Sequence, residues 1–337
     1  MLSIGSIRAK SSWEGFRLAL FIESGYNSNP ALLANHEFSA FDSGDPDWMR
    51  LESKDDGFSR LGLEPGFRFK AGDLRIIGAI AYRFTKYYLN TEMDYHFINP
   101  SLTLRYNKLR CDLSYALIPE YTIALYTDDD YSASAKYWSE YSMSRGNLDI
   151  RYDLFKNHSF GIAGNIEYKE YNANFPEYDG VGYKIGPVWR WSGPIYVKIN
   201  YAYRAYFARG FDNEGESLED SDETDISYVE DRIEGYLSKE VFLFTHKYLF
   251  GLSLELSQRF YSSEKDFSVD YLHVGRRDLR ADFKPFISYN FDDKTTIELE
   301  YLFTIRNADS PNYDIGYNKD FTRSIISLRL EYSIVGD

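Results

Sequence analysis

The chain alternates apolar and polar positions from end to end, over stretches that are long for strands of a soluble protein. In residues 74–84, an aliphatic or aromatic side chain stands at almost every even position, and arginines stand at 75 and 83. The same period of two recurs at 195–206, 297–306 and 323–332. Successive side chains of a β-strand point to opposite faces, so each stretch predicts a strand with one apolar and one polar face.

Fourteen such strands are predicted, at about 14–26, 57–70, 74–88, 95–106, 109–124, 136–154, 159–171, 180–191, 194–208, 227–242, 248–262, 269–291, 295–306 and 320–335. The connections between them alternate in length. Short turns are expected at 71–73, 107–108, 155–158, 192–193, 244–247 and 292–294. Longer polar connections are expected at 27–56, 89–94, 125–135, 172–179, 209–226, 263–268 and 307–319.

An even number of antiparallel strands with short turns at one end and long loops at the other is typical of a bacterial transmembrane β-barrel. Hydrocarbon cannot satisfy backbone N–H and C=O groups, so a sheet that crosses it must close on itself. The fold class expected is therefore all-β, a single closed antiparallel barrel of about fourteen strands over 1–337, with periplasmic turns and extracellular loops. The alternative is a soluble propeller or sandwich. Its packed core would have to accommodate the many charges of the polar face, and no repeat of about 40–45 residues is visible.

Composition supports this prediction. The 337 residues carry a net charge of −14 and include 31 Tyr and 24 Phe, and mean hydropathy is −0.46. No run of roughly 20 apolar residues exists for a membrane helix, yet the rings exclude a disordered acidic chain. Two lipid-facing aromatic girdles would account for many of the rings. The expected members are Phe67, Phe69, Trp189, Trp191, Tyr289 and Phe291 at the turn end, and Tyr82, Phe84, Tyr88, Tyr201 and Tyr203 at the loop end.

The compartment follows from the barrel prediction. No secretory leader precedes the first strand, which fits either a cytosolic protein or a mature chain whose signal peptide has been removed. The barrel favours the second, in the bacterial outer membrane, in contact with lipid and lipopolysaccharide. Cys111 has no second cysteine for an intramolecular disulfide and is expected on the lipid face. The acidic balance and the lack of Lys and Arg runs argue against a nucleic-acid partner.

The pattern resembles Gram-negative outer-membrane barrels of the porin-like, fourteen-strand class over the whole chain. A second resemblance lies in Gly25-Tyr26-Asn27-Ser28-Asn29-Pro30, which is similar to the Gly-Tyr-Asp-Ser-Asn opening of barrel domains in polysaccharide-export and surface-lipoprotein assembly proteins. Those relatives often have a periplasmic helical-repeat domain ahead of the barrel, which this sequence lacks. The chain also ends Ser333-Ile334-Val335-Gly336-Asp337, whereas such barrels usually end on an aromatic residue.

Residues out of phase with the apolar set are expected to face the lumen. They include twenty basic residues, sixteen of them Arg, and fifteen acidic residues, a surplus of five positive charges. Arg suits fixed bidentate contacts with carboxylate or phosphate. Two interpretations stay open: the cations pair with wall acids, or an unpaired surplus attracts anionic solutes. The candidate pore-lining residues are Arg75, Arg83, Arg151, Lys198, Arg204, Arg259, Arg280, Lys284, Glu298, Glu300, Arg306 and Arg329.

Two loops are expected to have roles of their own. A fourteen-strand barrel has a backbone diameter of roughly 28 Å and a potential lumen of order 15 Å. Loop 27–56 is the candidate plug, because it is long and its apolar pieces, 31–34 and 48–49, suggest packing. Loop 209–226 is strongly acidic. Solvated charge is the ordinary explanation, and a cation-bridged contact with lipopolysaccharide is the functional one; the spacing of a calcium loop is absent.

An enzyme is not expected. The sequence contains neither a Gly-x-Ser-x-Gly elbow nor a His-Glu-x-x-His motif. His158 and His246 fall in predicted turns and His96 on the lipid face, which leaves His273 with Asp266 and Asp270 as the acid–base candidate. The fifth histidine is His36. We expect no catalytic residues, metal or cofactor.

The sequence therefore predicts an outer-membrane channel for small hydrophilic, anionic solutes. The alternatives are an export or assembly barrel in a larger envelope complex, acting on an anionic polymer or with envelope proteins, and a plugged structural barrel.

Overall fold

A computed structural model describes residues 11–35, 37–43, 51–128, 132–213, 215–243, 246–311 and 315–336. The strands are β1 (Ser11–Asn27), β2 (Asp56–Ala71), β3 (Leu74–Tyr87), β4 (Tyr95–Tyr106), β5 (Leu109–Asp128), β6 (Ser132–Phe155), β7 (His158–Tyr171), β8 (Gly180–Ser192), β9 (Tyr196–Ala208), β10 (Tyr228–Leu243), β11 (His246–Tyr261), β12 (Arg277–Asn290), β13 (Thr295–Asp309) and β14 (Phe321–Gly336). The short helices are α1 (Glu37–Asp42), η2 (Thr91–Met93), η3 (Pro176–Tyr178) and α2 (Ile315–Lys319).

The fourteen strands form one closed barrel, as predicted. Each strand pairs antiparallel with its neighbours in the chain, and β1 pairs with β14 to close the sheet. That seam runs from Phe16 opposite Gly336 to Asn27 opposite Ile325. Closure gives the wall strands hydrogen-bond partners on both sides, which a hydrocarbon environment requires.

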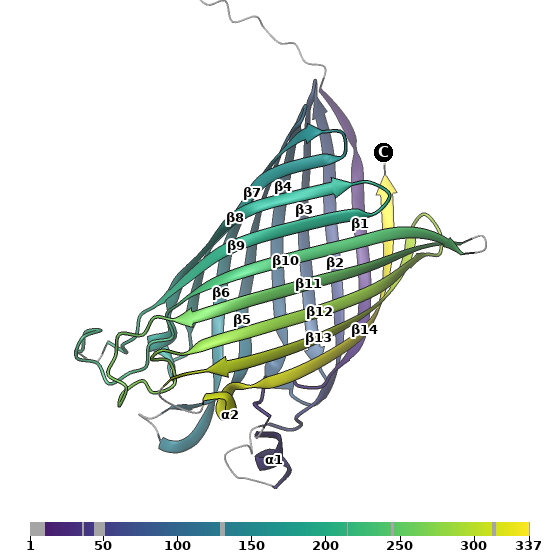
Figure 1. Ribbon diagram of the computed structural model, residues 1–337. Coiled ribbons are helices and arrows are strands. Elements are labelled where there is room, and N and C mark those ends of the chain that lie inside the picture. Colours follow the sequence, from purple (N-terminus) through teal and green to yellow (C-terminus); the bar gives the residue numbers. More distant parts are fainter. Residues whose placement is uncertain are drawn as a thin grey trace, which may run out of the picture.

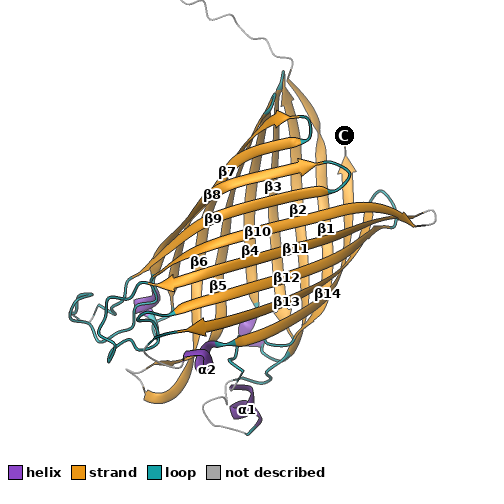
Figure 2. Ribbon diagram, viewed as in Figure 1, coloured by secondary structure: helices purple, strands orange, loops and turns teal. Residues whose placement is uncertain are grey.

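The connections separate the two ends of the barrel. One end has short turns, such as residues 72–73, 107–108 and 193–195, which we call the short-turn mouth. The long-loop mouth, at the other end, has the connections 28–55, 209–227 and 262–276. Figure 1 shows α1 and α2 at the long-loop mouth and the C-terminus at the opposite end, and Figure 2 shows that the wall between them is all strand.

Two predicted boundaries are wrong. The connection expected at 125–135 is mostly strand, because β5 continues to Asp128 and β6 starts at Ser132, through irregular pairing that follows Ile118. The strand expected from 269 starts at Arg277 instead. There, the backbone makes turns in which the N–H groups of His273 and Val274 donate to the carbonyl of Asp270. Alternating residues in 269–276 therefore belong to a folded loop.

The outward face is apolar, as the alternation predicted. Ile80, Ile162 and Ile185 each leave more than half of their surface exposed. The girdle residue Phe67 stacks on Trp13, with the ring centroids 6.1 Å apart. His96 lies on the outward face, where its ring stacks on Phe84 at 4.7 Å. This band gives the barrel a surface suited to acyl chains. Among the described residues, no helix has the length and apolar character needed to span a bilayer.

Candidate functional site: the charged inner wall

The structure places the predicted wall residues on inward-facing positions, and most of them pair with acids. Among the twelve candidates, the ion pairs are Arg75 with Glu14, Arg151 with Asp112 and Asp149, Arg204 with Glu167, Arg259 with Glu230, Arg280 with Asp282, Lys284 with Glu300, Arg306 with Asp278, and Arg329 with Glu331. No ion pair is found for Arg83, Lys198 or Glu298 within the described residues. The pairing interpretation thus describes the larger part of the wall.

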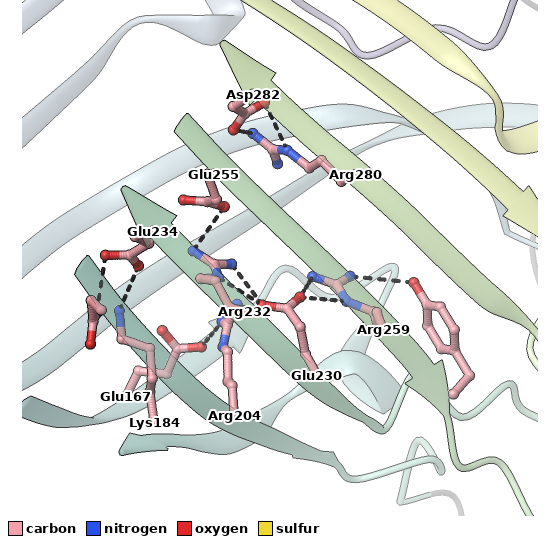
Figure 3. A network of polar contacts seen from close by, with 12 residues as sticks. Glu167, Lys184, Arg204, Glu230, Arg232, Glu234, Glu255, Arg259, Arg280 and Asp282 are labelled. Carbon is pink, nitrogen blue, oxygen red and sulfur yellow. Dashed lines mark hydrogen bonds and ion pairs between the residues drawn. The ribbon is translucent and has the colours of Figure 1, made fainter. Parts of the chain in front are cut away.

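The densest network lies on β7 to β12 (Figure 3). Glu230 of β10 is almost fully buried and accepts from Arg232 at 2.7 Å and from Arg259 at 3.0 Å. Arg232 continues to Glu255 of β11 at 3.1 Å. Glu230 is shared by two arginines and Arg232 by two carboxylates, so the ion pairs link β10 with β11 and restrain the charged side chains of this part of the wall.

A cavity of about 150 Å³ opens on the inner wall where β1, β2 and β3 face β12, β13 and β14. It brings together five of the candidate residues, Arg83, Lys284, Glu298, Glu300 and Arg329, with Phe21, Glu23, Arg60 and Ser327. Both signs of charge line this cavity.

Phe21 organises one side of that cavity. Its ring lies over Gly62 of β2, where a Cβ atom would collide with it, so the glycine permits this close approach. Arg83 and Arg329 then lie over Phe21 at 5.7 Å and 4.3 Å from the ring centroid. The Nε atoms of both arginines are buried without a hydrogen-bond partner in the part of the chain that is described.

Sequence reasoning missed a collar of aromatic rings inside the lumen at the long-loop mouth. We define the aromatic collar as Phe58, Tyr87, Tyr95, Tyr121, Tyr141, Tyr171, Tyr206, Tyr228, Tyr261 and Phe321. All but Tyr121 and Tyr141 are near the long-loop ends of their strands, because β5 and β6 continue beyond these two residues. Neighbouring rings touch: Tyr121 lies 5.0 Å from Tyr95 and 5.5 Å from Tyr141, measured between centroids. The alternation could have shown most of this collar, since its rings other than Tyr121 are out of phase with the lipid-facing set. Tyr121 faces inward because the register shifts after Ile118.

Cations cover several rings of the collar. Arg259 lies 3.8 Å from the centroid of Tyr228, and Lys169 lies 4.6 Å from that of Tyr141. Arg323 of β14 interacts electrostatically with Tyr121 of β5, five strands away around the wall, so its side chain extends into the lumen. The Nε atom of Arg323 is buried and lacks a hydrogen-bond partner among the described residues. The collar is thus a zone of the lumen wall in which aromatic rings and cations lie together.

Loop 28–55 folds over the long-loop mouth as a cap. Its core is Ala31, Leu33 and Leu51, which pack with Phe38, Phe41 and Trp138 of β6. The cap therefore reaches from β1 to a strand five positions away. The predicted packing of 31–34 is accounted for within the chain itself, whereas 48–49 and His36 lie outside the described residues.

The Gly25 to Pro30 motif anchors this cap. Asn29 is fully buried; its side-chain oxygen accepts from the Leu33 N–H at 2.8 Å, and its Nδ2 donates to the carbonyls of Leu33 and Thr322. Ser28 adds a pair of hydrogen bonds with Ser324 of β14. The motif thus has a local structural role, which fastens the loop to the barrel seam.

The acidic loop is pinned to the neighbouring loop by His273 and Asp270. The His273 Nδ1 and Asp270 Oδ1 atoms are 2.7 Å apart, and the Asp225 N–H donates to the other carboxylate oxygen at 3.1 Å. Burial lowers the pKa of His273. Burial opposes ionisation of Asp270, but its hydrogen bond with His273 keeps the Asp270 pKa below its usual value.

His273 and Asp270, the acid–base candidate, therefore form a buried pair with a structural role. The side chain of Asp266 instead accepts from Ser268 at 2.6 Å. Glu214 of the acidic loop lies outside the described residues. Within the described part of the chain, no three His, Cys, Asp or Glu side chains are grouped to hold a metal ion.

Comparisons with known proteins give resemblances in fold. No family model and no curated protein matches the sequence. Similar solved structures include OprD from Pseudomonas aeruginosa, at 11% identity and a TM-score of 0.38 over 97% of each chain. OmpT of Vibrio cholerae is similar at 9% identity and a TM-score of 0.45, over 96% of this chain and 98% of that one. A bacterial polysaccharide outer membrane secretin is similar at 9% identity and a TM-score of 0.45, over 94% of this chain and 98% of that one. The strand register shows a closed fourteen-strand antiparallel barrel, and this is the fold of outer-membrane β-barrel proteins.

Proposed function

We propose that the chain is an outer-membrane channel that passes small hydrophilic solutes and prefers anions. The outward apolar band and closed sheet suit a bilayer, and the charged inner wall suits water and ions. Solutes would pass the mixed-charge cavity and the aromatic collar, where Arg323 extends into the lumen.

The proposal rests on the excess of unpaired positive charge over unpaired negative charge on the inner wall. Among the described residues, the inward cations with no carboxylate partner are Arg68, Lys70, Arg83, Arg105, Arg145, Lys169, Lys198 and Arg323. Among the described residues, the inward acids with no cationic partner are Glu64, Asp153 and Glu298. Paired charges largely cancel, so the unpaired set fixes the sign of the field that a permeating ion meets.

Planar-bilayer recording tests this function. Across a KCl gradient, we expect a steady current whose reversal potential indicates anion preference, and Arg323→Gln should reduce that preference. Arg17→Gln is the matched control, because Arg17 already pairs with Glu331 at 3.0 Å. A cation-selective current would refute the proposed selectivity.

One observation favours the plugged barrel as a second function: the core of Leu33 and Leu51 packs against Trp138 of β6, five strands from β1. A barrel that conducts only after residues 31–50 are deleted would support this second function. If the intact and shortened chains both conduct nothing, the channel proposal fails, and the export or assembly barrel, with an anionic polymer or envelope proteins as partners, becomes the next hypothesis. Heat-modifiable gel migration checks that each variant has folded as a barrel.

A further inference from the structure

The strand register aligns five basic residues side by side on β2 to β6. Arg75 lies opposite Lys70 on one side and Arg105 on the other, Arg105 lies opposite Arg110, and Arg110 lies opposite Arg151. We call these residues the basic row. Directly opposed residues of antiparallel strands point to the same face, so all five side chains share the inner wall.

Repulsion within the basic row destabilises the fold, and the acids that pair with its other members leave Arg105, at the centre of the row, without a carboxylate partner among the described residues. Like charges on directly opposed residues destabilise a sheet. Glu14 pairs with Arg75 at 3.1 Å, and Asp112 receives both Arg110, at 2.8 Å, and Arg151. Arg105, between these pairs, is exposed and has no carboxylate partner within the described residues.

The basic row lies at the short-turn mouth. Lys70 and Arg75 flank the turn at 72–73, and Arg105 and Arg110 flank the turn at 107–108. The long-loop mouth instead has loop 209–227, with seven described acids between Asp212 and Asp225. The basic row and this acidic loop therefore place opposite signs of charge at the two ends of the barrel, which favours approach of an anion to the basic row.

We propose that the basic row is a capture site for small anions with two or more carboxylate or phosphate groups, which it takes up from the short-turn side. Arg105 is its central ligand. Strands lie about 4.8 Å apart, so Arg75, Arg105 and Arg110 present their guanidinium groups over about 10 Å, which a di- or tricarboxylate can bridge. Each guanidinium is a fixed fork that matches a carboxylate or phosphate.

Uptake of anions through the barrel rests on the proposed channel function, whereas binding of anions to the basic row does not. Citrate is the probe, added to either side of a single barrel in a planar bilayer. Orientation is read from the change in current when endoproteinase Glu-C is added to one chamber and cuts the acidic loop. We expect citrate to block from the short-turn side at lower concentration, and Arg105→Gln to raise the half-blocking concentration about ten-fold, as for loss of a charge-assisted contact.

Lys247→Gln is the control, because Lys247 is near the start of β11, at the short-turn mouth, and already pairs with Glu240 at 2.6 Å. It should leave the block unchanged. Thermal unfolding of the folded barrel in detergent supplies a second readout. Arg105→Gln should keep or raise the midpoint, because it removes repulsion from Arg75 and Arg110, whereas a merely structural role predicts a lower midpoint.

Citrate titration calorimetry on the detergent-solubilised barrel separates the two proposals. A barrel that conducts no ions but loses citrate affinity on Arg105→Gln supports the basic row and overturns the channel. An anion-selective current with equal block from both sides, unchanged by Arg105→Gln, overturns the basic row and leaves the channel standing.

Discussion

Arg204 of β9 and Glu167 of β7 form an ion pair across the intervening strand β8. Glu167 is nearly buried, and Arg204 also lies 5.4 Å from the centroid of Tyr228. The pair therefore holds a long arginine side chain flat against the wall near the aromatic collar.

Removal of this carboxylate should destabilise the barrel. Glu167→Gln leaves Arg204 without its acid, and breaking a buried pair on one side costs about 3 kcal/mol. Urea unfolding followed by tryptophan fluorescence measures the change. Glu240→Gln is the control, because the Glu240–Lys247 pair is more than two-fifths exposed on both sides and should be worth about 0.5 kcal/mol. Equal losses in the two variants would show that burial of the first pair has no consequence.

The aromatic collar should limit ion flow. Tyr121→Ala removes a ring that contacts Tyr95 and Tyr141, so we expect a larger single-channel conductance and a loss of roughly 3 kcal/mol of stability. Tyr152→Ala removes an exposed ring from the outward face and should leave conductance unchanged. If Tyr121→Ala conducts as the unmodified chain does, the narrowest zone lies elsewhere.

The cap should loosen when its core is cut. Leu33→Ala removes the side chain at the centre of the Ala31, Leu33 and Leu51 core, at a local cost of about 3 kcal/mol. Hydrogen exchange across 28–43 should become faster, with barrel strands unaffected. Asp42→Ala changes an exposed carboxylate on α1 that binds Lys54, and it should alter exchange far less. Matching exchange rates in both variants would argue that this core does not hold the cap.

Acid should release the acidic loop. The pKa values of His273 and Asp270 are both lowered in the folded chain, so the unfolded loop binds more protons and folding weakens as pH falls. The histidine contribution begins to fade near its ordinary value of about 6.5, and that of the aspartate follows at lower pH. Cleavage of loop 209–227 by Glu-C should therefore rise from pH 8 to pH 5. His273→Gln should flatten the upper part of that profile; an unchanged profile would assign the effect to other groups.

The sequence was sufficient for the barrel because alternation is a local property. Every predicted strand is present, and residues such as Ile80 and Ile162 face outward as their phase requires. The two errors have a common cause. At 125–135 the polar composition concealed a continuing ladder, and at 269–276 alternation hid the turns around Asp270. Composition and phase do not report which backbone groups find partners.

The inner wall was predicted only as far as phase allows. Phase placed Arg204 and Arg259 on the wall, but their acids Glu167 and Glu230 are 37 and 29 residues away and become neighbours only through register. The same holds for Arg105 between Arg75 and Arg110. The collar was missed because tyrosines were counted with the apolar lipid-facing set, although residues such as Tyr206 have the opposite phase. Tyr121 has the lipid-facing phase in the sequence, and the register shift after Ile118 turns it inward.

The seam between β1 and β14 has a consequence for how the barrel forms. Its first pair, Phe16 with Gly336, joins residues more than 300 positions apart, so the ladder that closes the wall cannot form before β14 is available. Closing so long a loop is entropically slow, and until then β1 and β14 are both open edges that can pair with another chain. Closure of the wall is therefore a late step of folding, and a chain truncated within β14 should aggregate through the exposed edges rather than form a smaller barrel.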